Sequence, residues 1–128
     1  MTQNEALRVL IVDDDPKQRQ LLKLTIKSLK LEVVGEGNNG AEAIELYRTL
    51  KPNMVFLDID MPVKDGISTL KELMAEFPDA NVIMVTSQDM RIIIDECLIA
   101  GAKDFIRKDA STYDIKERII SAIKEIKF

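Results

Sequence analysis

The sequence contains no histidine, and its only cysteine is Cys97. Without an imidazole, the chain cannot itself supply a histidine base, a histidine metal ligand or a phosphohistidine. A single cysteine excludes an internal disulfide and is typical of proteins from a reducing compartment. We therefore expect a cytoplasmic protein whose chemistry depends on other side chains.

Long apolar runs and an excess of positive charge are also missing. No segment is long enough to span a membrane, and the first residues, MTQNEALR, do not resemble a signal peptide. The net charge of −4 and the pI of about 4.9 argue against nucleic acid or an anionic membrane as the main partner. Hydrophobic residues make up 46% of the 128 residues, which is enough for the core of one domain.

Short apolar runs alternate with longer amphipathic segments along the whole chain. This alternation predicts an α/β fold with a doubly wound, five-stranded parallel sheet and helices on both faces. The fourth helix is expected to turn Met90, Ile94, Cys97 and Leu98 inward. The expected strands are 8–12, 31–36, 53–59, 81–87 and 103–108, and the expected helices are 16–30, 40–51, 66–77, 90–102 and 113–126.

Polar residues stand at the carboxyl end of nearly every expected strand. Asp13 and Asp14 follow the first strand, Asp58 ends the third, Thr86 ends the fourth, and Lys108 ends the fifth. In folds of this class, the site lies beyond these strand ends. Clustered carboxylates need a cation to stay ionised, and oxygen ligands without histidine or cysteine favour Mg²⁺. A lysine and a hydroxyl at the same edge suit a transferred phosphoryl group.

A simpler explanation of the DDD segment is that its aspartates only cap a helix. Asp15 directly precedes Pro16, which is the order expected for a helix N-cap and its first residue. One cap needs only one side chain, so we favour capping by Asp15 and a metal site for the other two aspartates.

Four segments together resemble the response regulator receiver domain of bacterial two-component signalling. They are VDDD after the first strand, LDIDMPVKDG around the third, VTS after the fourth and GAKDFIRK around the fifth. The resemblance covers about residues 7–126 and points to a single receiver domain over 1–128, similar to the chemotaxis regulators. It implies a flavodoxin-like strand order, 2-1-3-4-5.

The resemblance also implies roles for individual residues. Asp58 would accept a phosphoryl group from a histidine kinase or a histidine phosphotransfer protein. Thr86 and Lys108 would bind that group, and Thr86 and Phe105 would switch a partner-binding surface. Mg²⁺ would be held by Asp13, Asp14, Asp58 and the backbone carbonyl of Asp60.

Two further positions in this family, Asp60 and Gln88 here, often tune the lifetime of the aspartyl phosphate. Both side chains are polar, and the sequence does not give the lifetime.

The sequence departs from the family pattern directly after Lys108. Asp109 stands where the family usually has a proline after a cis peptide bond. Because a cis bond before a non-proline residue costs about 3 kcal/mol, we predict a trans Lys108–Asp109 bond. The long side chain of Lys108 should still reach Asp58, and the last helix should begin near Ser111 or Thr112. The alternative is a degenerate receiver that binds partners without being phosphorylated.

Two other motifs suggest different functions. GEGNNG, residues 35–40, matches the glycine pattern of a dinucleotide site, but it follows the second strand and the chain is short for that fold. The DID of residues 58–60 resembles the nucleophile motif of haloacid-dehalogenase phosphatases, but that family places it on the first strand. We consider both functions weaker alternatives.

The first expected helix carries basic residues and no acid. A solvated face explains this pattern most simply, although phosphorelay-type relatives dock the phosphodonor on this helix. The sequence leaves open whether the chain is a free-standing regulator, a phosphorelay intermediate or a fragment of a longer regulator, and we expect no output module after residue 128. The basic residues are Lys17, Arg19, Lys23, Lys27 and Lys30.

Overall fold

The computed structural model describes residues 6–61, 64–87, 91–126 and 128, in which strands and helices alternate. All strand pairs are parallel, in the order β2-β1-β3-β4-β5, so the predicted fold class and strand order are confirmed. The strands are β1 (Arg8–Val12), β2 (Glu32–Gly37), β3 (Met54–Asp58), β4 (Val82–Thr86) and β5 (Asp104–Arg107). The helices are α1 (Pro16–Ser28), α2 (Gly40–Leu50), α3 (Gly66–Glu76), α4 (Arg91–Ala100) and α5 (Thr112–Glu125).

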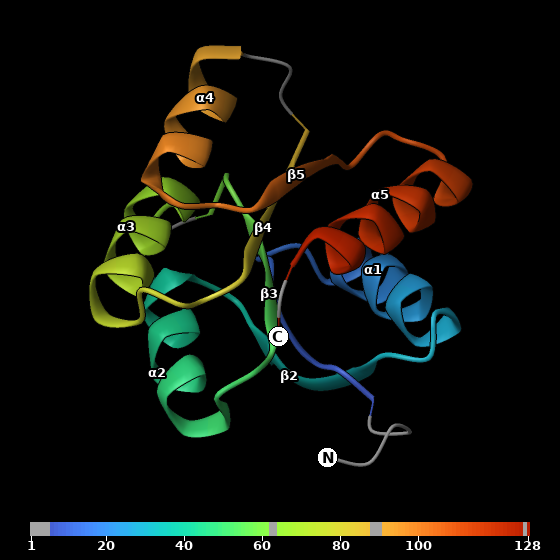
Figure 1. The fold of residues 1–128 in the computed structure, drawn as a ribbon, viewed down its shortest axis with the longest axis horizontal. Coiled ribbons are helices and arrows are strands. Elements are labelled where there is room, and N and C mark those ends of the chain that lie inside the picture. Colours follow the sequence, from blue (N-terminus) through green and yellow to red (C-terminus); the bar gives the residue numbers. More distant parts are fainter. Residues whose placement is uncertain (1–5, 62–63, 88–90, 127) are drawn as a thin grey trace.

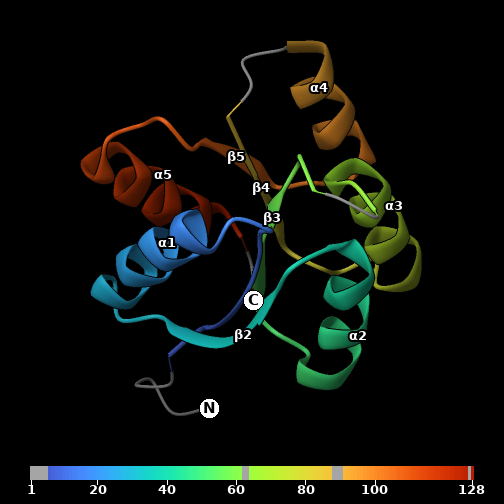
Figure 2. The ribbon, with the colours of Figure 1, turned by 180° about the vertical axis from the view of Figure 1, so that it is seen from behind.

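The helices cover both faces of the sheet. Figures 1 and 2 show α1 and α5 side by side on one face, and α2, α3 and α4 on the other. Successive strand residues point to opposite faces, so β1 sends Val9 and Ile11 toward α1 and α5, and Leu10 and Val12 toward the other three helices. Because both faces are covered, β3 and β4 are buried along their whole length.

The strand order brings the chemically important strand ends together. β1 and β3 are neighbours, and Val12 pairs with Leu57. The residues that follow this pair, Asp13 and Asp58, therefore leave the sheet side by side. β4 and β5 lie next to β3 in that order and bring their own carboxyl ends to the same edge.

Polar caps fix where the helices begin. Asp15 is the N-cap of α1, its side chain accepts the Lys17 N–H, and Pro16 is the first helical residue, which confirms the predicted cap. Asp65 caps α3 in the same way. Ser111 caps α5, so this helix begins at Thr112, within the predicted range.

The inward face of α4 differs by one position from the prediction. Ile94 and Cys97 are buried as expected, but Leu98 is 39% exposed, so its predicted inward orientation is wrong. Leu98 lies about 100° around the helix from Cys97, while Ile93 lies on the core side and packs there instead. Met90, the fourth expected core residue, lies outside the described residues.

The glycines of GEGNNG serve packing. A Cβ on Gly35 would lie 2.6 Å from the Leu50 side chain, and one on Gly40 would lie 1.9 Å from Thr69 Oγ1. The segment joins β2, an edge strand, to α2, and its Gly37 pairs with Val12 at the end of β1. Gly35 therefore allows α2 to approach β2 closely, and Gly40 allows α3 to approach α2, which explains these two glycines by packing without a dinucleotide.

In the part of the chain that the structure describes, no helix combines the length and the apolar content that a membrane span needs.

Candidate functional site

Three carboxylates converge where β1 and β3 end. Asp13, Asp14 and Asp58 each offer an oxygen, and these oxygens lie within 4.8 Å of one another. Asp13 and Asp58 are buried at 2% and 1% exposure, whereas Asp14 is exposed. The cluster thus has a buried floor and one carboxylate at its rim.

The Lys108 side chain reaches this cluster from β5. Its Nζ lies 3.1 Å from Asp13 Oδ2 and 3.2 Å from Asp58 Oδ2. The Lys108–Asp109 bond is trans, as predicted, and Lys108 reaches Asp58 as predicted. Asp109, the unusual acid after Lys108, pairs with Arg107 Nη2 at 2.8 Å. Lys108 therefore keeps Asp13 and Asp58 as its partners.

Burial and charge set the protonation states in the pocket. Burial raises the pKa of Asp58, and the negative charge of Asp13 raises it further. Lys108 counteracts both effects, and the resulting pKa is about 7. Burial alone would lower the pKa of Lys108, but the carboxylates of Asp58 and Asp13 outweigh it and raise the pKa. Lys108 is therefore an ammonium at neutral pH.

The hydrogen bonds leave part of the carboxylate cluster unsatisfied. Asp13 Oδ1 accepts the Asp15 N–H at 2.9 Å, and Asp58 Oδ1 accepts the Asp60 N–H at a long 3.3 Å. Among the described residues, buried Asp58 Oδ2 has no hydrogen bond of regular geometry, although Lys108 is near. Unsatisfied oxygen ligands of this kind suit Mg²⁺, so the pocket fits the expected ion.

Thr86 lies at the same edge of the sheet, at the end of β4. It is fully buried and follows Val85, which pairs with Asp58 across the sheet. The Lys108 N–H donates to the Thr86 carbonyl at 2.8 Å, so the backbone joins the ends of β4 and β5. The fold thus brings Asp58, Thr86 and Lys108 to one edge.

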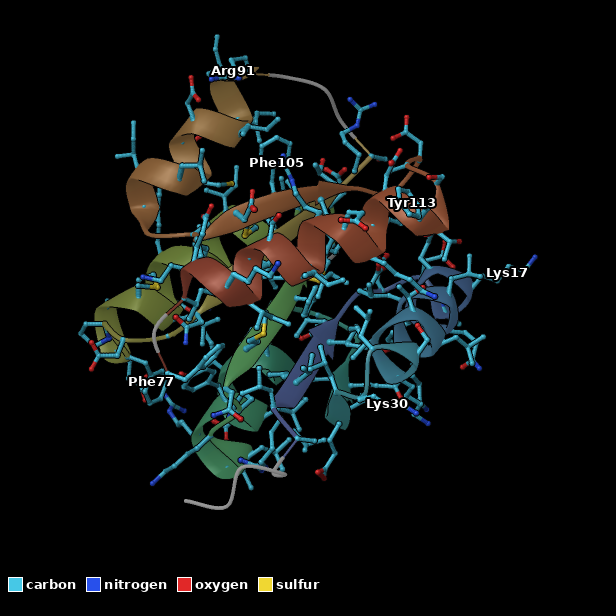
Figure 3. All side chains as sticks on the ribbon, turned by 45° about the vertical axis from the view of Figure 1, so that its right-hand side comes forward. Lys17, Lys30, Phe77, Arg91, Phe105 and Tyr113 are labelled. Atoms are coloured by element: carbon cyan, nitrogen blue, oxygen red, sulfur yellow. The ribbon has the colours of Figure 1, made fainter. Side chains whose placement is uncertain are left out.

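Phe105 lies in β5, between α4 and α5 (Figure 3). Its ring is partly buried against the core, and the Arg118 guanidinium of α5 lies 4.9 Å from the ring centroid. Arg118 Nε also donates to the Phe105 carbonyl at 3.1 Å, and the Phe105 N–H donates to Asp104 Oδ1 at 2.8 Å. The expected switch residue is therefore held by two side chains.

The segment after Asp58 approaches α3 closely. The Gly66 N–H donates to the Ile59 carbonyl at 2.8 Å, and a Cβ on Gly66 would lie 2.1 Å from the carbonyl oxygen of Asp58. The exposed side chain of Asp60 lies in this segment. Gln88, the other expected lifetime position, lies outside the described residues.

Two contacts at the site could not be predicted from the sequence. Nothing in the pattern indicates Arg118 as the partner of Phe105, and Arg19 is predicted only as one residue of a basic helix. Arg19 Nη1 donates to the carbonyl oxygen of Asp13 at 2.6 Å. Helical spacing gives no signal for such a contact, because a long side chain reaches back to a loop outside its own helix.

Comparisons with known proteins agree with this geometry. The family model for the response regulator receiver domain matches residues 9–120. The chemotaxis protein CheY of Thermotoga maritima is 40% identical over 119 residues, which are 93% of this chain and 96% of that protein. CheY of Bacillus subtilis is 38% identical over 94% of this chain and 97% of that protein.

A solved relative has the same fold. CheY in the CheX–CheY–BeF₃–Mg²⁺ complex of Borrelia burgdorferi superposes with a TM-score of 0.88 at 32% identity, covering 91% of this chain and 89% of that one. The sheet order, the acidic pocket and these matches lead to one conclusion: the chain belongs to the response regulator receiver domain family of two-component signalling, among its CheY-like members.

Proposed function

We propose that this chain is a phosphoacceptor that takes a phosphoryl group onto Asp58 and thereby switches a partner-binding surface. The observation that carries this proposal is the position of Lys108, whose ammonium lies 3.2 Å from Asp58 and 3.1 Å from Asp13 in a buried pocket. An ammonium held there can neutralise a phosphoryl oxygen next to the attacking carboxylate.

Asp58 is the nucleophile in this proposal. One of its carboxylate oxygens attacks the phosphorus, the bond from phosphorus to the donor's imidazole nitrogen breaks, and an acyl phosphate forms as the imidazole leaves. Lys108 pairs with the transferred group, and the Thr86 hydroxyl donates to one of its oxygens. Since the chain lacks histidine, the phosphohistidine must come from a partner, either a histidine kinase or a histidine phosphotransfer protein.

Mg²⁺ is the cofactor that the pocket would hold. Asp13, Asp14, Asp58 and the carbonyl of Asp60 would be its protein ligands. When bound, the ion supplies positive charge that offsets the phosphoryl oxygens and the clustered carboxylates. The B. burgdorferi CheY described above was solved with Mg²⁺, which supports this assignment.

The proposed output surface is the face formed by α4, β5 and α5. Thr86 and Phe105 border this face, and α4 exposes Ile92 and Ile99 at 79% and 87% on its outer side. Large apolar side chains with this exposure offer contact area to a partner protein. Phosphorylation would favour a second conformation in which Phe105 has moved and the surface is changed. Such a response is a population shift between two states.

The degenerate receiver remains the second candidate because Asp109 replaces the usual proline. The acidic residues and Lys108 lie close together all the same, which favours the phosphoacceptor. Neither candidate names the kinase or the target protein. We also propose a cytoplasmic location and no direct contact with nucleic acid, in line with the single cysteine and the acidic composition.

Labelling with acetyl phosphate and Mg²⁺, followed by intact-mass analysis, tests the proposal. The wild-type chain should gain one phosphoryl group, and Asp58→Asn should gain none, because the amide is a poor nucleophile of nearly the same shape. Asp65→Asn is the matched control, since asparagine can also cap α3. Equal labelling of Asp58→Asn and wild type would move the acceptor elsewhere. No labelling of the wild type by acetyl phosphate or a phosphohistidine donor would favour the degenerate receiver.

A further inference from the structure

Arg19 joins the loops that follow β1 and β2. Its Nη1 donates to the carbonyl oxygen of Asp13 at 2.6 Å and to Asn38 Oδ1 at 2.8 Å, while its Nε lies 3.2 Å from Glu36 Oε1. The side chain is only 17% exposed. One guanidinium of α1 therefore connects the loop that carries Asp13 and Asp14 to the end of β2.

The acceptors of Arg19 are themselves held by regular elements. Glu36 belongs to β2 and also accepts from Lys23 Nζ at 2.9 Å, and this hydrogen bond outweighs desolvation and lowers the pKa of Glu36, so it stays ionised. The Asn38 N–H donates to Glu42 Oε1 at 2.9 Å in the first turn of α2. Arg19 is thus anchored to β2 and α2.

The contact of Arg19 with the Asp13 carbonyl restricts the orientation of the Asp14 side chain. The carbonyl of Asp13 and the N–H of Asp14 belong to one planar peptide, so holding that oxygen restricts the plane from which the Asp14 side chain projects. The preceding peptide is also held, because the Asp13 N–H donates to the Gly37 carbonyl at 3.0 Å. Mg²⁺ requires near-octahedral ligands at short distances and tolerates little misplacement.

From this geometry we infer that Arg19 is a positioning residue for the Mg²⁺ site. It holds the Asp13–Asp14 peptide against the end of β2 and touches neither Asp58 nor any carboxylate of the cluster in the contacts described. The inference rests on the proposed function, since it assigns Arg19 to the same site.

The charge of Arg19 makes the inference testable by the sign of the effect. A positive charge beside a cation site repels the cation, so removing a bystander arginine would leave Mg²⁺ affinity unchanged or raise it. Removing a positioning residue would lower the affinity, because the ligands lose their orientation. The two roles therefore predict opposite changes.

The test is a Mg²⁺ titration of the full chain, followed by amide NMR. Arg19→Gln should weaken Mg²⁺ binding about 5- to 10-fold, at or just below the lower end of the range for residues that support metal ligands. Lys23→Gln is the matched control, because it removes one positive charge from the same Glu36 without a described contact to Asp13. It should bind Mg²⁺ as well as the wild type or slightly better. The carbonyl carbon shift of Asp13 should change in Arg19→Gln only.

Asn38→Ala tests the inference without changing any charge, and it decides the matter if Arg19→Gln does not fold. It removes one acceptor of the Arg19 guanidinium, Asn38 Oδ1, and should weaken Mg²⁺ binding about two- to threefold. Unchanged or tighter binding in the folded Arg19→Gln variant overturns the inference and leaves the proposed function intact. A wild-type chain that fails to bind Mg²⁺ overturns both. Weakening by Lys23→Gln equal to that by Arg19→Gln also overturns the inference, since it would show a general effect of charge.

Discussion

The fold disfavours the negative charge of Asp58. Its pKa rises from an ordinary value of 3.8 to about 7 because of burial and the nearby Asp13. The unfolded chain therefore releases this proton at a lower pH than the folded chain. Between these two pH values the folded state binds more protons, so the stability contributed by this residue falls as pH rises.

In the metal-free protein, the contribution of Asp58 to stability should therefore fall between about pH 4 and about pH 7, and Asp58→Asn should remove that fall. At pH 8 we expect the variant to be more stable than the wild type by about 1–2 kcal/mol, less than the full pKa shift implies because structural relaxation and water penetration reduce the cost of a buried charge. Urea unfolding in a chelating buffer at pH 5 and pH 8 measures this difference, with Asp65→Asn as the control. Parallel pH dependences of the variant and the wild type would contradict the raised pKa.

Asp14 differs from the other two carboxylates because it is exposed. We expect Asp14→Ala to weaken Mg²⁺ binding at least about 10-fold, since a direct ligand is lost. Relief of carboxylate repulsion should leave the thermal stability equal to or slightly above that of the wild type. Calorimetric Mg²⁺ titration measures the affinity, and Asp15→Asn, which keeps the α1 cap, is the control. Unchanged affinity would remove Asp14 from the ligand set.

Individual residues were predictable where their role depends on position along a strand or at a helix end. Asp13, Asp58 and Lys108 could be placed together because parallel strands end at one edge. The cap at Asp15 followed from the proline after it. The reach of Arg19 and the contact of Arg118 with Phe105 could not be predicted, because they depend on the rotamers of long side chains.

At the scale of elements, α3 packs unusually close to the strand that carries Asp58. Gly66→Ala should be strongly destabilising, because its Cβ would lie 2.1 Å from the carbonyl oxygen of Asp58. That oxygen belongs to the backbone, and moving it to relieve the clash would cost free energy of folding. We expect a loss of at least about 2 kcal/mol in the free energy of unfolding, measured by urea denaturation. Gly37→Ala is the control, since the nearest atom to its Cβ would be a methyl of Leu46 at 3.3 Å and no backbone atom is among its near contacts, so it should cost less than about 1 kcal/mol. Equal losses would contradict this account.

The order of the elements was predictable, and the inward face of one helix was not. Apolar periodicity placed the strands and helices to within a few residues, and the trans bond after Lys108 followed from the absence of proline. In α4, however, consecutive apolar residues stand on both sides of Asp95 and Glu96, so the pattern could not distinguish Leu98 from Ile93 as the core residue. Only the packing of α4 on its neighbours decides which of these two side chains faces the core.

At the scale of the whole molecule, the proposed acceptor and the proposed output surface lie on different strands. Asp58 ends the central strand β3, whereas Phe105 lies in the edge strand β5. Adding BeF₃⁻ with Mg²⁺ should therefore change amide shifts at Thr86 and across residues 91–108 as well as in the pocket. Two-dimensional amide NMR measures this, and Asp58→Asn is the control that should show neither change. Shifts confined to residues 13–15 and 58–60 would mean that the pocket does not communicate with β5.

The edge position of β5 has a consequence beyond signalling. An edge strand presents backbone groups that can pair with a strand of another molecule, which is a common start of aggregation. At Phe105 both backbone groups are already bonded, the N–H to Asp104 and the carbonyl to Arg118. The same two side chains that hold the expected switch residue therefore also close this point of the sheet to intermolecular strand pairing, so a substitution made to loosen Phe105 would at the same time make the protein more prone to self-association.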